Sequence, residues 1–223
     1  MSRVANLKNL GKFIAFEGCE GAGKTTQINL LAKALEVNGL DFVLTREPGG
    51  TPGAEKIRSL LVEGDISRWQ PMTEALLHYS ARLEHVNSII IPALKRGAWV
   101  ISDRFSDSTL AYQGYGLGLG SSDIKMLHKL VLGDFQTDLT IILDVPNDIG
   151  VARAKKREEN EVIAEDRYER MDLDFHQKVK DGFLDIARLN SARCVVIDAD
   201  RSMEDVNFKI IELIKSRFDK VLK

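Results

Sequence analysis

A short apolar run followed by a glycine-rich turn constrains the fold of this chain most strongly. The segment FIAFEGCEGAGKTT spans residues 13–26 and carries the pattern GxxxxGK[ST] from Gly18 to Thr25. Glycines let the backbone curl so that successive N–H groups point at phosphate oxygens, and a following helix adds the positive end of its dipole. Lys24 would reach the β- and γ-phosphates of a nucleotide, and the Thr25 hydroxyl would bind Mg²⁺. The pattern predicts a nucleoside triphosphate site.

A glycine-rich turn that arose by chance is the alternative interpretation of this loop. It leaves unexplained why a strand pattern precedes the turn and a helix pattern begins within it. The residues expected to hold the nucleotide are Gly18, Cys19, Glu20, Gly21, Ala22, Gly23, Lys24, Thr25 and Thr26.

Short β-rich runs alternate with longer helical patterns along the chain. Most of these runs are continuously apolar, as expected for strands buried on both faces of a parallel sheet. The expected strands cover residues 12–16, 41–45, 98–102, 139–145 and 193–198. Strands and helices in alternation predict a doubly wound α/β fold, which binds ligands at the carboxyl ends of its strands.

Three helices are predicted from apolar spacing and end signals. The first covers residues 25–39 and ends at Gly39, a residue suited to a helix C-terminus. The second covers residues 71–97 and is interrupted or bent at Pro92. The last covers residues 202–222, with apolar side chains at helical spacing.

Composition is that of a soluble globular protein. The 223 residues are 44% hydrophobic and 29% charged, which fits one domain over residues 1–223. The formal net charge of -2 gives no basic field, so nucleic acid is not an expected partner. Cys19 and Cys194 lie too far apart in sequence to suggest a disulfide framework or a zinc site. No run has the character of a signal peptide or a membrane span, so no membrane partner is expected and the cytoplasm is the expected compartment.

The third apolar strand ends in Asp103-Arg104, and this pair bears on where the phosphate goes. A carboxylate suits Mg²⁺ or its water shell, whereas an arginine beside it suits a second anion. A nucleotide phosphate near Asp103 and a second phosphate-sized anion at Arg104 would lie close together, which indicates a phosphorylated acceptor. The DxxG and NKxD elements of GTPase switches do not stand in suitable places.

Further segments favour a small-molecule acceptor. Residues 45–55, TREPGGTPGAE, form a rigid loop after the second strand. His78 and Arg82 are four residues apart and share a helix face, where a ring and a guanidinium can stack on a base and bind it. Tyr112 and Gln113 lie on the segment that leaves the third strand. Taken separately, the loop is also consistent with a structural turn and the helix face with a solvated one.

Residues 150–170, GVARAKKREENEVIAEDRYER, are densely charged with both signs. Mobile arginines neutralise the charge of phosphoryl-transfer transition states, and a charged lid can exclude water. By composition alone the segment is also consistent with a solvated helix. The lid interpretation makes Arg153 and Arg157, together with Lys24 and Asp103, the candidate catalytic residues.

Four motifs that occur in order resemble those of thymidylate kinases of the bacterial type. They are FEGCEGAGKTT, TREPGGTP, SDRFSDSTLAYQG and DFHQKVKDGFLDIA, and the resemblance leaves only residues 1–11 outside as an N-terminal extension. It implies a three-layer P-loop nucleoside-monophosphate-kinase fold, in which helices flank a five-stranded parallel sheet and a short lid is present. It also implies transfer of the γ-phosphate of ATP to dTMP, giving dTDP in dTTP synthesis, with Mg²⁺ and usually in a homodimer.

The resemblance also implies roles for individual residues. Arg104 would hold the dTMP phosphate, Asp103 and Thr25 would serve the metal, Arg82 would read the thymine edge, and Tyr112 would crowd the 2′ position. In the subtype with EGAG in the loop, the catalytic arginine comes from the lid. The acceptor-binding residues expected on this basis are Glu20, Glu47, Pro48, Arg58, His78, Arg82, Arg104, Thr109, Tyr112 and Gln113.

Two positions depart from the family pattern. His78 stands where a phenylalanine commonly stacks on thymine, and an imidazole there can stack on the base and add a pH-dependent charge. Glu158 follows Arg157 where a glycine is usual, which leaves the choice between Arg153 and Arg157 open.

Other functions are consistent with part of the pattern. A kinase for another nucleoside monophosphate, or for a deoxynucleoside, would share the phosphate loop, and His78 leaves this choice open. A P-loop switch that hydrolyses ATP and controls a partner is a second class. The Asp103-Arg104 strand end favours a kinase over this switch.

Overall fold

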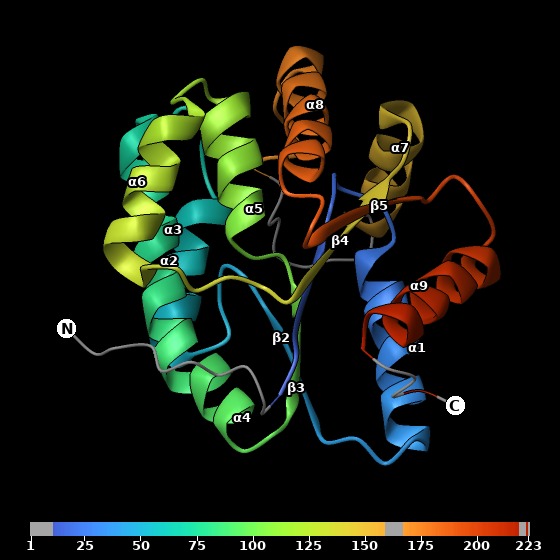
Figure 1. Ribbon diagram of the computed structural model, residues 1–223. Coiled ribbons are helices and arrows are strands. Elements are labelled where there is room, and N and C mark those ends of the chain that lie inside the picture. Colours follow the sequence, from blue (N-terminus) through green and yellow to red (C-terminus); the bar gives the residue numbers. More distant parts are fainter. Residues whose placement is uncertain (1–10, 159–166, 219–221, 223) are drawn as a thin grey trace.

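The computed structural model describes residues 11–158, 167–218 and 222 of the chain. These residues contain a five-stranded parallel sheet with the strand order β2-β3-β1-β4-β5 (Figure 1). The strands are β1 (Phe13–Glu17), β2 (Phe42–Arg46), β3 (Trp99–Asp103), β4 (Leu139–Asp144) and β5 (Cys194–Asp198). Each overlaps one of the predicted apolar runs, so the predicted parallel α/β sheet is confirmed. The strand before the phosphate loop, β1, lies at the centre.

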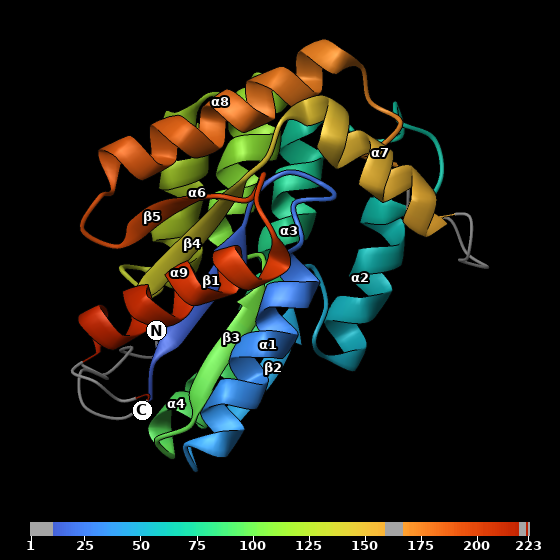
Figure 2. The same ribbon diagram turned by 90° about the vertical axis from the view of Figure 1, so that its right-hand side faces the viewer.

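One face of the sheet is covered by two helices that are far apart in sequence. These are α1 (Lys24–Val37) and α9 (Met203–Arg217), which lie side by side in Figures 1 and 2 and contact each other. Leu31 of α1 and Ile210 of α9 are fully buried in one apolar cluster with Phe16 of β1. The apolar residues whose spacing predicted both helices therefore form the side of each helix that packs on the sheet.

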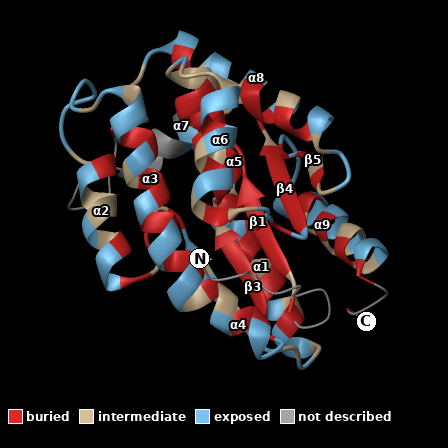
Figure 3. Cartoon of the chain, turned by 60° about the vertical axis from the view of Figure 1, so that its left-hand side comes forward, coloured by how far each residue is buried: buried red, intermediate tan, exposed pale blue. Residues whose placement is uncertain are grey.

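Several helices cover the opposite face, and together with the sheet they make three layers. Figure 3 shows buried residues along the strands and on the inward sides of these helices. They are α3 (Pro71–His85), α4 (Ile91–Lys95), α5 (Ser106–Thr109), α6 (Ser121–Leu132) and α8 (Leu173–Leu189). The three-layer architecture expected from the sequence is confirmed.

The predicted helix over residues 71–97 is interrupted before its proline. A π-helical turn at Val86–Ile90 joins α3 to α4, and Pro92 lies in the first turn of α4. Proline lacks the N–H that an unbroken helix would use, and a wider π-helical turn is one way to accommodate that loss. The predicted interruption is therefore present, but it begins several residues earlier than Pro92.

Two helices lie in segments that the sequence treated as loop and lid. The helix α2 (Pro52–Val62) begins inside the proline- and glycine-rich loop, where the Thr51 hydroxyl accepts a hydrogen bond from Ala54 N at 3.2 Å and caps the helix. The helix α7 (Asn147–Glu158) opens the lid segment. The rest of that segment up to residue 166, and residues 1–10 of the N-terminal extension, lie outside the described residues. Among the described residues, no helix is long and apolar enough to cross a membrane.

Candidate active site

The loop between β1 and α1 has the conformation that a phosphate cradle needs. Gly18, Gly21 and Gly23 have φ values of 128°, 69° and 88°, a range in which side chains are strained. A Cβ at Gly21 would lie 2.0 Å from the carbonyl oxygen of Gly150, at the start of α7, so no side chain fits there. The glycines of the motif are therefore required both for the backbone curl and for the close approach of the lid helix.

Lys24 closes over this loop. Its Nζ donates hydrogen bonds to the carbonyl oxygens of Gly18 at 3.2 Å and Cys19 at 3.0 Å. Burial, and next the nearby Arg104 guanidinium, lower the pKa of Lys24 from its ordinary value. The ammonium is therefore held over the mouth of the cradle, at the position from which it would meet phosphate oxygens.

The two residues expected to serve a metal are brought together. Thr25 Oγ1 donates to Asp103 Oδ2 at 3.1 Å, although the residues lie 78 positions apart. A hydroxyl and a carboxylate are hard oxygen donors, and Mg²⁺ commonly completes its coordination with waters and substrate phosphates. The described residues hold no group of three His, Cys, Asp or Glu side chains that could bind a metal by themselves. The donor set therefore fits a Mg²⁺ ion that arrives with a nucleotide.

Arg104, which the sequence analysis expected to hold the acceptor phosphate, contacts the phosphate loop at the Gly18 carbonyl oxygen, at 3.1 Å. It follows β3 with a φ of 69°, which turns its side chain back towards the phosphate loop. Its Nη2 contacts Glu20 Oε1 at 2.5 Å and the Tyr112 hydroxyl at 3.1 Å, and its Nη1 donates to Ser108 Oγ at 3.0 Å. Burial opposes the charge, but Glu20 and Tyr112 raise the pKa of Arg104 well above its ordinary value. The guanidinium is thus a fixed, permanently charged group beside the loop.

A buried carboxylate behind Arg104 was missed by the sequence analysis. Glu17, at the end of β1, is 0% exposed and accepts hydrogen bonds from the backbone N–H groups of Phe105 at 2.8 Å and Ser108 at 3.2 Å. Ser108 Oγ donates to Glu17 Oε2 at 2.5 Å and accepts a hydrogen bond from Arg104 Nη1 at 3.0 Å. Glu17 therefore anchors the turn that carries Arg104. Burial, and then the negative charge of Asp107, raise the pKa of Glu17 to about 7.

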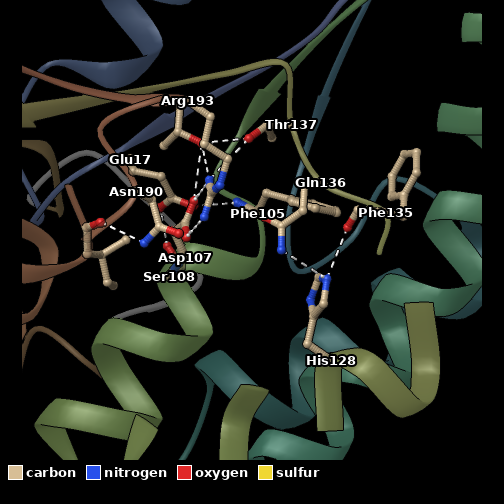
Figure 4. Close-up of polar contacts among 12 residues, drawn as sticks. Glu17, Phe105, Asp107, Ser108, His128, Phe135, Gln136, Thr137, Asn190 and Arg193 are labelled. Carbon is tan, nitrogen blue, oxygen red and sulfur yellow. Dashed lines mark hydrogen bonds and ion pairs between the residues drawn. The ribbon is translucent and has the colours of Figure 1, made fainter. Parts of the chain in front are cut away.

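Figure 4 shows a second group of polar contacts that lies next to this anchor. Arg193, just before β5, donates to both carboxylate oxygens of Asp107 at 2.6 Å and 2.7 Å. Its Nη1 also contacts Thr137 Oγ1 at 3.3 Å. This network links α5, which follows Arg104 closely in sequence, to the residues just before β4 and β5.

The Glu17→Gln variant is expected to lose part of the pH dependence of stability. A carboxyl group whose pKa rises on folding holds a proton that the unfolded chain has released, so the free energy of unfolding falls as pH rises through that window. For Glu17 the window runs from 4.5 to about 7, and the loss is at most about 3 kcal/mol. Urea unfolding of wild type and variant at several pH values measures it. Equal slopes against pH in the two proteins would contradict the assignment.

The other end of the site is built around Arg82 on α3. Its Nε pairs with Glu47 Oε2 at 2.6 Å, and its Nη2 donates to the Phe105 carbonyl and to Thr109 Oγ1, both at 3.0 Å. Glu47 Oε1 also contacts His85 Nδ1 at 2.9 Å. Arg82 Nη1 is buried and has no hydrogen-bond partner among the described residues. This fixed guanidinium therefore keeps one N–H end that no described residue uses.

His78 carries no charge here, contrary to the pH-dependent charge considered for it. Burial, and then the positive charge of Arg82, lower the pKa of His78 to about 3. Its Nε2 lies 3.0 Å from the Tyr168 hydroxyl. His78, which replaces the phenylalanine expected from the family resemblance, therefore places a neutral ring with one polar contact at this position. Tyr168 was not among the expected site residues, since nothing in its local sequence distinguishes it from a lid residue.

A cavity of about 1010 Å³ joins these two ends. Most of the expected residues line it, including Arg153 of the lid helix, and so do Glu55, Ser108, Tyr168 and Glu169, which were not predicted. Gly18, Cys19 and Thr109 do not line it, and Thr109 lies behind Arg82, to which its hydroxyl is bonded. The Arg157 side chain lies outside the described part of the chain. The predicted residues that line the cavity are Glu20, Gly21, Ala22, Gly23, Lys24, Thr25, Thr26, Glu47, Pro48, Arg58, His78, Arg82, Asp103, Arg104, Tyr112, Gln113 and Arg153.

The chain is similar to thymidylate kinases in sequence and in structure. The thymidylate kinase family model matches residues 16–210. A thymidylate kinase of Caulobacter vibrioides is 49% identical over 207 residues, covering 93% of this chain and 97% of the relative. One of Pelobacter propionicus is 42% identical and covers 94% and 97% of the two chains. The crystal structure of thymidylate kinase from Ehrlichia chaffeensis superimposes with a TM-score of 0.73 at 38% identity, covering 92% of this chain and 99% of that one. The chain therefore belongs to the thymidylate kinase family.

Proposed function

We propose that this phosphotransferase of the thymidylate kinase family makes dTDP from dTMP and MgATP, with the two substrates at opposite ends of the cavity. The observation that carries the proposal is a pair of buried atoms, Arg82 Nη1 and Gln113 Oε1, that have no partner among the described residues and whose side chains line the cavity. The first is a donor and the second an acceptor. Thymine presents the O4 acceptor and the N3–H donor along one edge, so one base would satisfy both.

The same pair disfavours cytosine as the base. Cytosine presents a donor at N4 and an acceptor at N3, which is the reverse of thymine. A cytosine in this position would face Arg82 with a donor and Gln113 with an acceptor. Each buried group would then face a like group without gaining a hydrogen bond, which is costly. Uracil has the same edge as thymine, so the two differ here only by the 5-methyl group.

The dTMP phosphate would lie at Arg104, between the base site and the phosphate loop. The Arg104 guanidinium is charged and fixed by Glu20, and the Tyr112 hydroxyl contacts Glu20 Oε1 at 3.2 Å. These contacts hold the Tyr112 ring between the phosphate and base positions, where it would meet the sugar. This supports the assignment of Arg104 to the phosphate and of Tyr112 to the deoxyribose.

Phosphoryl transfer needs little beyond positioning and charge neutralisation. A dTMP phosphate oxygen would attack the γ-phosphorus of ATP in line, and no general base is assigned because this oxygen is already anionic near neutral pH. Lys24 would bind the β- and γ-phosphates, while Thr25 and Asp103 would hold Mg²⁺. A bound Mg²⁺ supplies charge neutralisation at the phosphates.

Arg153 is the candidate for the lid arginine. It lies on α7 and lines the cavity, so a modest movement of the lid helix would bring its guanidinium to the transferring phosphate. An arginine at that place would neutralise charge on the equatorial oxygens. A catalytic role for Arg157 stays a prediction from the sequence.

The acceptor specificity is tested by following ADP formation from MgATP with dTMP, dUMP, dCMP, AMP and thymidine. We expect rapid turnover with dTMP, slower turnover with dUMP, and little with dCMP, AMP or thymidine. Preference for another monophosphate would keep the mechanism and change the substrate. Equal ADP formation without any acceptor would instead favour the P-loop switch.

A homodimer is proposed from an exposed apolar face on two neighbouring helices. The helices α3 and α6 contact each other, and apolar side chains that are at least 40% exposed gather on them. These are Met72, Leu76, Leu83, Met126 and Leu130. A second copy of the chain would bury this face, and sedimentation velocity of wild type and of Leu130→Glu would detect the association. The cytoplasmic location stays a prediction from the sequence.

A further inference from the structure

We infer that Glu74 fixes the orientation of the Gln113 amide, and that the pocket thereby selects bases with an N3–H, thymine and uracil, over cytosine. The inference rests on the proposed function and extends it to residues that do not read the base themselves. We call Glu74, Arg167 and Tyr168 the orientation cluster. They come from α3 and from the segment before α8, and the sequence analysis assigned no role to any of them.

The Gln113 amide nitrogen is held by this cluster. Gln113 Nε2 donates to Glu74 Oε1 at 2.8 Å and to the Tyr168 hydroxyl at 3.3 Å. The Tyr168 hydroxyl itself donates to Glu74 Oε1 at 2.8 Å. Glu74 and Gln113 are both 0% exposed, so water does not compete for these contacts. The amide nitrogen therefore has both of its acceptors within the cluster, whereas Gln113 Oε1 has no partner among the described residues.

The carboxylate of Glu74 is in turn held by Arg167. Arg167 Nη2 pairs with Glu74 Oε2 at 2.6 Å, and the two side chains are 3% and 0% exposed. The same guanidinium donates to the carbonyl oxygens of Leu61 at 3.1 Å, Asp65 at 3.0 Å and Ile66 at 2.9 Å. A buried charge with this many fixed partners does not reorient easily, so Glu74 is a rigid acceptor.

Each hydrogen bond in this cluster has a fixed donor and a fixed acceptor. A carboxylate only accepts, and the one hydrogen of the Tyr168 hydroxyl goes to Glu74, so this hydroxyl can only accept from Gln113 and His78. Burial, and then the charge of Glu74, raise the pKa of Tyr168 well above its ordinary value, which keeps the hydroxyl protonated. An amide turned the other way would place Gln113 Oε1 against Glu74, acceptor against acceptor. The cluster therefore leaves Oε1 as the only group that Gln113 offers to a base.

The Glu74→Gln variant tests this inference most directly. A glutamine at position 74 can donate to Gln113 Oε1, which lets the Gln113 amide turn and present Nε2 to the cavity. We expect the kcat/KM ratio of dCMP to dUMP to rise about 10- to 100-fold relative to wild type, with the KM for ATP little changed. The two acceptors differ only on the edge that Gln113 reads, so a general loss of structure would lower both alike.

Tyr168→Phe is the second variant, and Tyr115→Phe is its matched control. Tyr168→Phe removes one of the two acceptors of Gln113 Nε2 and should raise the same ratio about threefold or more. Tyr115→Phe also removes a tyrosine hydroxyl, one bonded to Asp185 at 2.6 Å and not lining the cavity, and should leave the ratio unchanged. If circular dichroism shows that Glu74→Gln does not fold, Tyr168→Phe decides alone.

The outcomes separate this inference from the proposed function. Wild type that fails to phosphorylate dTMP would overturn the proposed function, and the inference with it. Wild type that uses dTMP and rejects dCMP, while folded variants lose all acceptors in parallel, would overturn only the inference. A raised dCMP to dUMP ratio in Glu74→Gln or Tyr168→Phe, with Tyr115→Phe unchanged, would support it.

Discussion

Replacing Lys24 with alanine is expected to lower kcat by about a thousandfold or more. The Lys24 ammonium lies over the phosphate loop and donates to the carbonyl oxygens of Gly18 and Cys19. Arg104 also donates to the Gly18 carbonyl oxygen, at 3.1 Å, but of the two only Lys24 donates to Cys19. Its charge is needed most when negative charge moves onto the β–γ bridging oxygen. The KM for dTMP should change little, because Lys24 belongs to the ATP side. Steady-state kinetics with each substrate varied in turn measures both effects.

Lys33→Ala provides the control for this variant. Lys33 lies on the same helix, is exposed, and does not line the cavity, so its removal changes the net charge equally without touching the site. It should retain the kcat of wild type. A Lys24→Ala enzyme that keeps more than about a tenth of the wild-type kcat would contradict the role assigned to this residue.

Replacing Arg104 with alanine is expected to raise the KM for dTMP by about 100-fold or more while leaving the KM for ATP within a few-fold of wild type. The Arg104 guanidinium is held in place by Glu20, Tyr112 and Ser108 before any substrate arrives. Because it is already ordered, it can bind an anion without further loss of side-chain entropy. Its removal would also take away the positive charge that lies 2.5 Å from the Glu20 carboxylate, so the negative charge of Glu20 would repel the dTMP phosphate more strongly.

Arg104→Lys separates charge from geometry at this position. Lysine keeps the positive charge but lacks the planar fork that contacts Glu20 and Tyr112 at once, so an intermediate rise in KM for dTMP is expected. Arg96→Ala serves as the surface control, since Arg96 is half-exposed and pairs with Asp41 at the far end of β2. If Arg104→Ala raised both KM values equally, the acceptor-side assignment would be wrong.

The phosphate loop and the sheet are the parts that local sequence predicts best. Glycine is favoured where the backbone must take a positive φ, as it does at Gly18 and Gly23. Lys24 and Thr25 follow at a fixed spacing because the next helix begins there. Continuous apolar runs can be buried on both sides only inside a sheet with helices on each face. Asp103 and Arg104 could be assigned to the site because they stand at the carboxyl end of β3. The carboxyl ends of parallel strands lie at the same edge of a sheet, where the phosphate loop also follows β1.

Contacts between distant segments were not predictable in the same way. The sequence predicted an interruption at Pro92, but it did not predict that a π-helical turn begins earlier, at Val86. Glu17 resembles any residue at the end of a strand until Phe105 and Ser108 fold over it. His78 has an ordinary helical context, and only burial beside Arg82 decides that its ring stays neutral.

By itself, the sequence determined that this chain forms a parallel α/β sheet around a phosphate loop, because backbone conformation and apolar periodicity are local properties. It also predicted which charged residues line the cavity at the ends of the strands, among them Lys24, Asp103 and Arg104. Only the tertiary structure brought together the residues that we propose to orient the base-reading amide. Glu74, Gln113 and Tyr168 are separated by tens of residues, and the direction of their hydrogen bonds is set by a buried pair with Arg167 that exists only after folding.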